Sequence, residues 1–184
     1  MNLIESFKKT ITFFEGLQKE GFIDGYALIG GLALSAWVRP RTTRDIDVVV
    51  AVSQRAEWRD IEALVETRLS KRIAIQKGTR RTNIQEKLSY VSGPIEVDVI
   101  STKGFDLAAD AIDHAMIAEV FDQKVRVVTP EYLILLKLLP LSSQDIIDIM
   151  ALAKAADMDS VRALADKYYL LPKLESVFPK QKRK

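Results

Sequence analysis

Two aspartates begin a segment whose other residues predict a buried strand. Asp45 and Asp47 open the run 45–50, which continues as a row of valines, although aspartate is depleted in strands. Side chains two residues apart on a strand point to one face, so both carboxylates project together. Such a pair needs a cation, a proton or solvent to offset its repulsion. The spacing favours a divalent metal site, and a solvated strand end with surface ion pairs is the alternative.

A second acidic strand is predicted further along the chain. In the run 95–100, Glu96 and Asp98 alternate with aliphatic residues and share one face. Combined with Asp45 and Asp47, one of these acids could complete a site that holds two magnesium ions about 3.5–4 Å apart for phosphate transfer. The third carboxylate would bind a metal ion or accept a proton. Asp98 is the preferred third acid because it lies nearer the middle of the strand, and Glu96 is the alternative.

A pair of glycines precedes the acidic strand. Gly30 and Gly31 lie between a predicted strand at 26–29 and a predicted helix at 32–37. Without a Cβ atom the backbone can approach a phosphate closely, and the free amides at a helix start attract anions. The glycines therefore predict a phosphate-binding turn, with a tight strand-to-helix turn as the alternative.

Several polar side chains could assist such a site. Arg41 could bind phosphate oxygens with both ends of its guanidinium group, and Thr43 shares the strand face of the two aspartates. Lys137 is the only cation in the apolar segment 132–139, so it either reaches solvent or contacts a triphosphate. The segment 68–81 contains six cations and no acid. That segment is either a track for an RNA backbone or a solvated loop.

The composition excludes several classes of protein. The 184 residues include no cysteine, which excludes disulfides and thiolate zinc sites, and 48% of them are hydrophobic. The first 20 residues lack the apolar core of a signal peptide. No apolar run approaches the roughly 18 residues that span a membrane. We therefore expect a cytoplasmic protein without a membrane partner, with one domain or one domain and an appendage.

The hydrophobic periodicity predicts a chain of mixed strands and helices. Helices are predicted over 1–18, 32–37, 54–69, 132–139, 142–156 and 159–168, with a helical or irregular segment at 103–114. Strands are predicted over 26–29, 45–52, 72–75, 87–91, 95–100, 116–120 and 125–128, with a polar loop at 76–85. Ser53 is the expected N-cap of the helix 54–69, and Gly93-Pro94 marks a hairpin turn. Thr129-Pro130 predicts a helix start, which divides the chain into a catalytic domain over 1–128 and a helical extension with a basic tail over 129–184.

The order of these motifs resembles a known superfamily. A hydrophobic residue before Gly30-Gly31, then the Asp45/Asp47 pair, then Asp98 on a later strand is similar to the nucleotidyltransferase superfamily with the DNA polymerase β-like fold. The run Arg41-x-Thr43-x-Asp45-x-Asp47 further resembles the branch that contains the abortive-infection AbiE-type toxins. That branch also carries a lysine-bearing helix followed by an acid, similar to 131–137 and then Asp145.

The resemblance implies an α+β fold with a mixed sheet, flanking helices and a helical C-terminal part. It implies a magnesium-dependent enzyme that moves a nucleoside monophosphate from an NTP such as ATP to an acceptor hydroxyl, with an acceptor such as tRNA or another RNA and an antitoxin protein as partner. The implied metal-binding and catalytic residues are Asp45, Asp47 and Asp98, and the implied nucleotide-binding residues are Gly30, Gly31, Arg41, Thr43 and Lys137.

One departure and two alternatives accompany this resemblance. Many relatives carry a serine at or after the second glycine, whereas Leu32 follows Gly31 here, so any phosphate contact must come from backbone amides. The first alternative is a catalytically inactive nucleotidyltransferase-like module that binds RNA or a protein. The second is a nucleotidyltransferase with a small-molecule acceptor of the aminoglycoside type.

Overall fold

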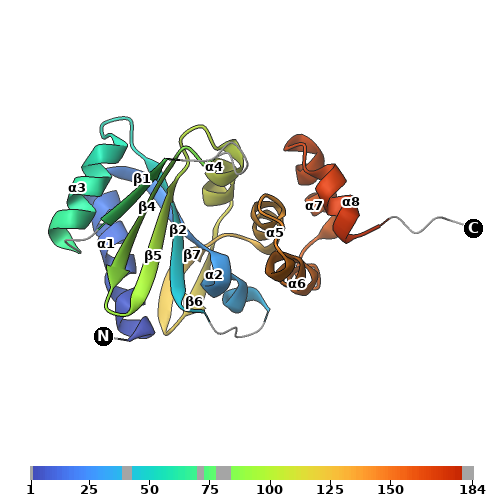
Figure 1. Ribbon diagram of the computed structural model, residues 1–184, viewed down its shortest axis with the longest axis horizontal. Coiled ribbons are helices and arrows are strands. Elements are labelled where there is room, and N and C mark those ends of the chain that lie inside the picture. The colour runs from blue at the N-terminus through green and yellow to red at the C-terminus, as the bar shows by residue number, and fades with distance from the viewer. Residues whose placement is uncertain (1, 39–42, 70–72, 78–83, 180–184) are drawn as a thin grey trace, which may run out of the picture.

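The computed structural model describes residues 2–38, 43–69, 73–77 and 84–179 as a mixed sheet flanked by helices (Figure 1). The helices are α1 (Leu3–Glu20), α2 (Gly30–Trp37), α3 (Trp58–Arg68), α4 (Asp106–Asp113), α5 (Pro130–Leu138), α6 (Ser143–Leu152), α7 (Met158–Lys167) and α8 (Leu171–Val177). The strands are β1 (Ile23–Ile29), β2 (Asp45–Val52), β3 (Ile73–Lys77), β4 (Glu86–Ser92), β5 (Ile95–Ser101), β6 (Met116–Val120) and β7 (Gln123–Val127).

The strands form one seven-stranded sheet in the order β3-β4-β5-β2-β1-β7-β6. The hairpins β3/β4, β4/β5 and β6/β7 are antiparallel, as is the pair β1/β2, whereas β2/β5 and β1/β7 are parallel. Parallel neighbours require a crossover connection, and between β2 and β5 this connection contains α3, β3 and β4. The predicted α+β class with a mixed sheet is confirmed.

One face of the sheet packs against α1 and α3, which lie together on the same side in Figure 1. The ring of Tyr26 in β1 stacks on Phe14 of α1, with centroids 5.9 Å apart, and Tyr26 pairs with Val50 of β2. Thr10 of α1 hydrogen-bonds the hydroxyl of Tyr90 in β4 at 3.0 Å. Val50 therefore points to the same face as Tyr26. Since side chains alternate along a strand, the odd-numbered residues of β2 point to the opposite face.

The opposite face packs against α2 and α4, and α5 lies against both of these helices. The C-terminal helices extend from α5 on this side of the molecule (Figure 1). Thr129 is the N-cap of α5 and Pro130 lies in its first turn, as predicted. The boundary proposed at residue 128 falls between β7 and α5, and the division into a catalytic domain and a helical extension stays a prediction.

The predicted start of α3 is wrong. The helix begins at Trp58, and the segment 53–57 is irregular. The Ser53 hydroxyl accepts a hydrogen bond from the Arg55 amide at 3.4 Å, which is a local turn and not a helix cap. Instead, the carboxylate of Asp60 accepts a hydrogen bond from the amide of Glu57 at 2.8 Å and satisfies one free amide at the helix start.

Other elements differ from the prediction in extent. Strand β3 reaches Lys77, inside the predicted loop, and α6 stops at Leu152, short of the predicted end. The helix α8 was missed, because seven residues are too few to show a clear period. Within the described ranges, no helix is long and apolar enough to cross a membrane.

Candidate active site

The four acids of the two predicted strands lie on one face of the sheet. Strands β2 and β5 are parallel neighbours, and their register pairs Asp45 with Glu96 and Asp47 with Asp98. Asp45 and Glu96 are exposed, whereas Asp47 and Asp98 are partly buried. The alternation along β2 directs these side chains away from α1, toward the side of α2 and the C-terminal helices.

Gly30 makes room for the carboxylate of Asp47. Its φ angle is +67°, and a Cβ atom at this position would lie 1.9 Å from Oδ2 of Asp47. Only glycine avoids both the left-handed backbone penalty and this overlap. The glycine pair was interpreted as an approach for a phosphate, and the structure adds that Gly30 admits the neighbouring aspartate.

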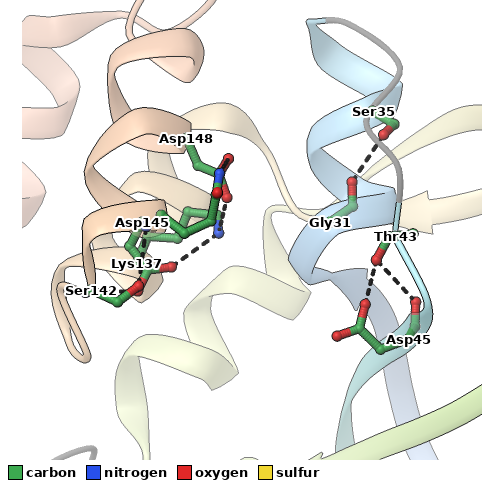
Figure 2. A network of polar contacts seen from close by, with 9 residues as sticks. Gly31, Ser35, Thr43, Asp45, Lys137, Ser142, Asp145 and Asp148 are labelled. Carbon is green, nitrogen blue, oxygen red and sulfur yellow. Dashed lines mark hydrogen bonds and ion pairs between the residues drawn. The ribbon is translucent and has the colours of Figure 1, made fainter.

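Gly31 lies in the first turn of α2. The α2 helix begins at Gly30 itself and not at Leu32 as predicted, because Ile29 still pairs with Asp47 and the chain turns directly after it. The amides of a first helical turn have no partner inside the helix. The backbone carbonyl of Gly31 accepts a hydrogen bond from the Ser35 hydroxyl at 3.0 Å (Figure 2). This bond uses a carbonyl of the first turn of α2 and leaves its amides available.

Asp47 lies where negative charge accumulates. Its burial, together with the charges of Asp45 and Asp98, raises its pKa to about 7, while the ammonium groups of Lys87 and Lys137 oppose this rise. A carboxyl group whose pKa is raised this far by burial and by neighbouring carboxylates marks a candidate functional site. A cation bound next to Asp47 would restore its ionised form at neutral pH.

The raised pKa predicts how stability depends on pH in metal-free protein. Between the ordinary value of 3.8 and about 7, folded Asp47 keeps a proton that the unfolded chain releases. The contribution of this group to stability therefore falls as the pH rises from about 4 to 7. We expect Asp47→Asn to remove this contribution, so that the urea midpoints of wild type and variant, measured in EDTA, diverge as the pH rises. Parallel curves would contradict it.

Thr43 contacts the first aspartate. Its hydroxyl donates a hydrogen bond to the carboxylate of Asp45 (Figure 2). Thr43 therefore lies next to the aspartate pair, as predicted, and this bond orients the Asp45 side chain. Arg41, the other residue expected in this segment, lies outside the described residues. Its contact with phosphate stays a prediction.

Asp98 is bound by two side chains of β4 that the sequence interpretation missed. Lys87 Nζ lies 2.6 Å from Oδ2 of Asp98, and Ser89 Oγ donates to Oδ1 at 2.5 Å. The signal was present in the hairpin turn at Gly93-Pro94, because counting back from it pairs Ser89 with Asp98 and places Lys87 on the same face. The residue expected to be free for chemistry is therefore already part of a polar cluster.

Lys137 lies opposite the aspartate pair, on α5. Its ammonium group contacts Asp148 at 2.7 Å and Asp145 at 3.3 Å (Figure 2). Only 12% of the Lys137 side chain and 4% of the Asp148 side chain are exposed. Of the two predicted roles for Lys137, simple extension into solvent is therefore excluded. Its contact with a triphosphate stays a prediction.

The start of α6 holds the two acids that pair with Lys137. Ser142 is the N-cap, its hydroxyl donates to Asp145 at 2.6 Å, and its amide donates to the same carboxylate at 3.0 Å. Burial raises the pKa of Asp145, but the hydrogen bonds from Ser142 and the charge of Lys137 together hold it below its usual value. Asp145 and Asp148 are three residues apart on a helix and so face the same way. This spacing could have identified Asp148 from the sequence.

The residues of α2 and β2 around the aspartate pair and the residues of α5 and α6 around Lys137 form opposite walls of one pocket, which has a volume of about 310 Å³. Figure 2 shows the α2 and β2 wall facing the α5 and α6 wall. The polar and glycine residues that line the pocket are Gly30, Gly31, Thr43, Asp45, Asp47, Lys137, Ser142, Gln144, Asp145 and Asp148. The pocket therefore joins the glycine turn, the aspartate pair and the predicted lysine, from segments distant in sequence. Asp98 is not among its lining residues.

The donor set suits a magnesium ion in part. Among the described residues, no three acidic or histidine side chains converge closely enough to hold a metal ion as they stand. Asp45 and Asp47 nevertheless offer oxygen donors from one face of β2, and magnesium is usually held by one or two carboxylates with water and substrate phosphates. The pair therefore fits one such ion. Asp98 as a metal ligand stays a prediction.

A family model matches most of the chain. The model described as "Nucleotidyl transferase AbiEii toxin, Type IV TA system" matches residues 12–179. No curated protein matches the sequence.

Solved structures share the fold. An antigenic nucleotidyltransferase-like protein from Paracoccidioides brasiliensis is 18% identical, with 94% of this chain and 92% of that chain covered and a TM-score of 0.54. The solution structure of the antibiotic-resistance factor ANT(2'')-Ia is 15% identical, with 94% and 96% covered and a TM-score of 0.57. The crystal structure of ANT(2'')-Ia in complex with adenylyl-2''-tobramycin is 16% identical, with 88% and 97% covered and a TM-score of 0.55. These likenesses confirm the predicted nucleotidyltransferase fold and do not by themselves assign a substrate.

Proposed function

The chain belongs to the AbiEii family of nucleotidyl transferase toxins, and from this premise we propose that it transfers a nucleoside monophosphate from an NTP to an acceptor hydroxyl at the pocket between β2 and α6. The observation that carries the proposal is the pocket itself, which joins Gly30 and Gly31, the Asp45/Asp47 pair and Lys137. The family membership confirms the nucleotidyltransferase branch expected from the motifs.

The glycine turn is the proposed site for the phosphates of the NTP. Gly31 lines the pocket within the first turn of α2, and backbone amides at a helix start attract phosphate groups. The residue directly after Gly31 is Leu32 and not a serine, so the backbone amides supply the contact. On the opposite wall, two of the three N–H donors of Lys137 are directed to aspartates, and the third remains for a phosphate oxygen.

Asp45 and Asp47 would hold the divalent cation, with Thr43 keeping Asp45 in position through its hydrogen bond. A bound magnesium ion neutralises phosphate charge and lowers the pKa of an attacking hydroxyl. Asp98 lies beside Asp47 on the next strand. Lys87 and Ser89 hold the orientation of Asp98. Because a carboxylate has about four acceptor sites, Asp98 keeps sites beyond these two contacts, and we propose it as the acceptor of the proton from the attacking hydroxyl, next to the pocket.

Replacing Lys137 by methionine is expected to lower both stability and nucleotide affinity. The change leaves Asp145 and the buried Asp148 without the ammonium group between them, and removing one partner of a buried ion pair costs about 3 kcal/mol. We expect a matching drop in the free energy of urea unfolding, and at least about tenfold weaker NTP binding by equilibrium dialysis below the unfolding temperature.

Lys137→Arg is the matched control for charge. It keeps a cation between the two aspartates and should recover most of the stability, while the bulkier guanidinium group narrows the pocket. If Lys137→Met unfolds at the same urea concentration as wild type, the ion pairs do not stabilise the fold. If its NTP affinity is also unchanged, Lys137 does not contact the nucleotide.

RNA is the acceptor we propose, with tRNA first. The support is the membership of a toxin family and the cations of the segment 68–81 in the sequence. The structure pairs Arg68 with Glu20 at 2.9 Å, an exposed ion pair that RNA would have to compete with. Most of the remaining cations lie outside the described residues. We also propose a cytoplasmic location and an antitoxin protein partner, following the toxin–antitoxin description of the family.

A transfer assay tests the function. Purified protein with magnesium and each of the four α-labelled NTPs is offered tRNA, total RNA without tRNA, or an aminoglycoside, the kind of acceptor seen with ANT(2'')-Ia. We expect label on RNA and none in the presence of EDTA. Label on the aminoglycoside alone would exclude RNA, and no label with any NTP and any acceptor would overturn the proposal.

A melting experiment separates the enzyme from an inactive binding module. A ligand that binds only the folded protein raises the melting temperature by mass action. If the pocket binds a metal–nucleotide complex, magnesium and a non-hydrolysable NTP together should raise the melting temperature by more than the sum of the two rises measured with each ligand alone. An inactive module would show no such mutual effect.

A further inference from the structure

Asp98 has a cation next to it before any metal ion is added. Lys87 Nζ lies 2.6 Å from its Oδ2, and Ser89 donates to its Oδ1. The Lys87 and Asp98 side chains are only 22% and 19% exposed. An ion pair this close and this well covered is screened far less than a surface pair.

The strand register gives Lys87 this position. Ser89 lies directly opposite Asp98 across the β4/β5 ladder, and Lys87 lies two residues earlier on the same face. Asp98 in turn lies beside Asp47 across the β2/β5 ladder. Lys87 therefore reaches Asp98 from the strand that lies on the far side of β5 from β2.

The acids differ in their access to the pocket. Asp45 and Asp47 line the 310 Å³ pocket, whereas Asp98 and Lys87 do not. A metal ion that enters with a nucleotide therefore meets the β2 pair first. When all three are ionised, Asp45, Asp47 and Asp98 together with the Lys87 ammonium group have a formal net charge of −2, three negative charges and one positive, which equals the charge of one divalent cation in magnitude.

We propose that the Lys87 ammonium group takes the place of a second metal ion beside Asp98, so that this site works with one divalent cation held by Asp45 and Asp47. The inference rests on the proposed function and replaces the two ions expected from the motifs. Lys87 is then a positioning residue, because it holds Asp98 and compensates its charge without touching the nucleotide. A second dication at Asp98 would bring a further positive charge to the carboxylate that the ammonium group already contacts.

Manganese is the probe that tests this inference, because Mn²⁺ replaces Mg²⁺ and is visible by electron paramagnetic resonance. Two Mn²⁺ ions about 3.5–4 Å apart give a spin-coupled spectrum, whereas one ion does not. The full chain is loaded with Mn²⁺ and a mixture of the α,β-methylene analogues of the four NTPs. We expect no coupled pair in wild type. We expect a coupled pair in Lys87→Met, with Mn²⁺ bound at least about tenfold more tightly.

Two variants control the experiment. Lys87→Arg keeps the positive charge and should show no coupled pair. Lys103→Met removes a cation whose side chain is 69% exposed and lies 3.2 Å from Glu86, outside the cluster of Asp98, and it should show the wild-type Mn²⁺ spectrum. Lys87→Gln serves if the methionine variant fails to fold, which a thermal melt reveals.

The outcomes separate this inference from the proposed function. A coupled pair in wild type overturns the role of Lys87 and leaves the proposed function standing. A folded Lys87→Met or Lys87→Gln that binds a single Mn²⁺ overturns it in the same way. No Mn²⁺ binding by wild type in the presence of the analogues overturns both the inference and the metal dependence of the proposed reaction.

Discussion

Asp47→Asn is expected to lower kcat/KM for nucleotidyl transfer about a thousandfold, or about 4 kcal/mol of transition-state stabilisation. Asp47 lines the pocket, lies in register with Asp98 and is the more buried of the β2 pair. An amide is a poor metal ligand in place of a carboxylate, so the variant loses the cation that stabilises the charge on the phosphates. Initial rates of label transfer to RNA at saturating magnesium measure the loss.

The same variant should not be less stable than wild type at pH 8 without metal. At this pH the carboxylate of Asp47 is ionised next to Asp45 and Asp98, and the neutral amide relieves that repulsion. Equal or higher urea midpoints would therefore show that lost activity is not lost folding. Transfer that continues at the wild-type rate in Asp47→Asn would overturn the proposed site.

Glu96→Gln is the matched control on the neighbouring strand. Glu96 pairs with Asp45 in the ladder but is exposed, so its loss should change kcat/KM less than about threefold, as expected for a surface charge. Asp98→Asn should lower the rate at least about a hundredfold, because it removes the proposed proton acceptor. The opposite ranking of the two variants would make Glu96 the third acid.

Gly30→Ala is expected to destabilise the fold and abolish transfer together. The added Cβ atom would lie 1.9 Å from Oδ2 and 2.9 Å from Cβ of Asp47, so the backbone must move as well as the carboxylate. With the left-handed φ penalty of about 1–2 kcal/mol and the overpacking cost of about 1–3 kcal/mol, we expect a loss of about 3 kcal/mol in urea unfolding. Activity should fall as far as in Asp47→Asn, because the carboxylate is displaced.

A double-mutant cycle isolates the overlap from the backbone penalty. In an Asp47→Gly background, Gly30→Ala should cost only about 1–2 kcal/mol, since the φ penalty alone remains. Gly16 in α1 is the control, because a Cβ there has ordinary contacts, the nearest being Glu20 at 3.9 Å. Gly16→Ala should raise stability by about 0.5–1 kcal/mol. Equal costs of Gly30→Ala in both backgrounds would contradict the contact with Asp47.

Much of the candidate site could be inferred from local patterns. The position of Asp45 and Asp47 before a valine run predicted a strand with both carboxylates on one face, and β2 has that form. Strict alternation in 95–100 predicted β5 in the same way. Side chains of a strand alternate between its two faces. The residue types of a short segment are therefore enough to predict which side chains share a face. The superfamily resemblance then related the two strands to each other.

The failures share a physical cause. Ser53 was taken as a helix cap because a serine before a helical pattern favours that role, but its hydroxyl accepts from Arg55 in a local turn and α3 starts later. Helix propensities of ordinary residues span only about 0.7 kcal/mol, so local propensity is a weak guide to the first helical residue. Trp58 is buried and α3 packs against β3 and β4, and this packing selects the observed start.

Residue types and spacings along short stretches of chain were enough to predict the fold class, the family and the face on which Asp45 and Asp47 project. Three contacts follow only from the folded chain: Lys87 with Asp98, Lys137 with both Asp145 and Asp148, and Gly30 with Asp47. Such contacts depend on strand register and helix packing, and these are fixed by the burial of the whole core and not by any local pattern.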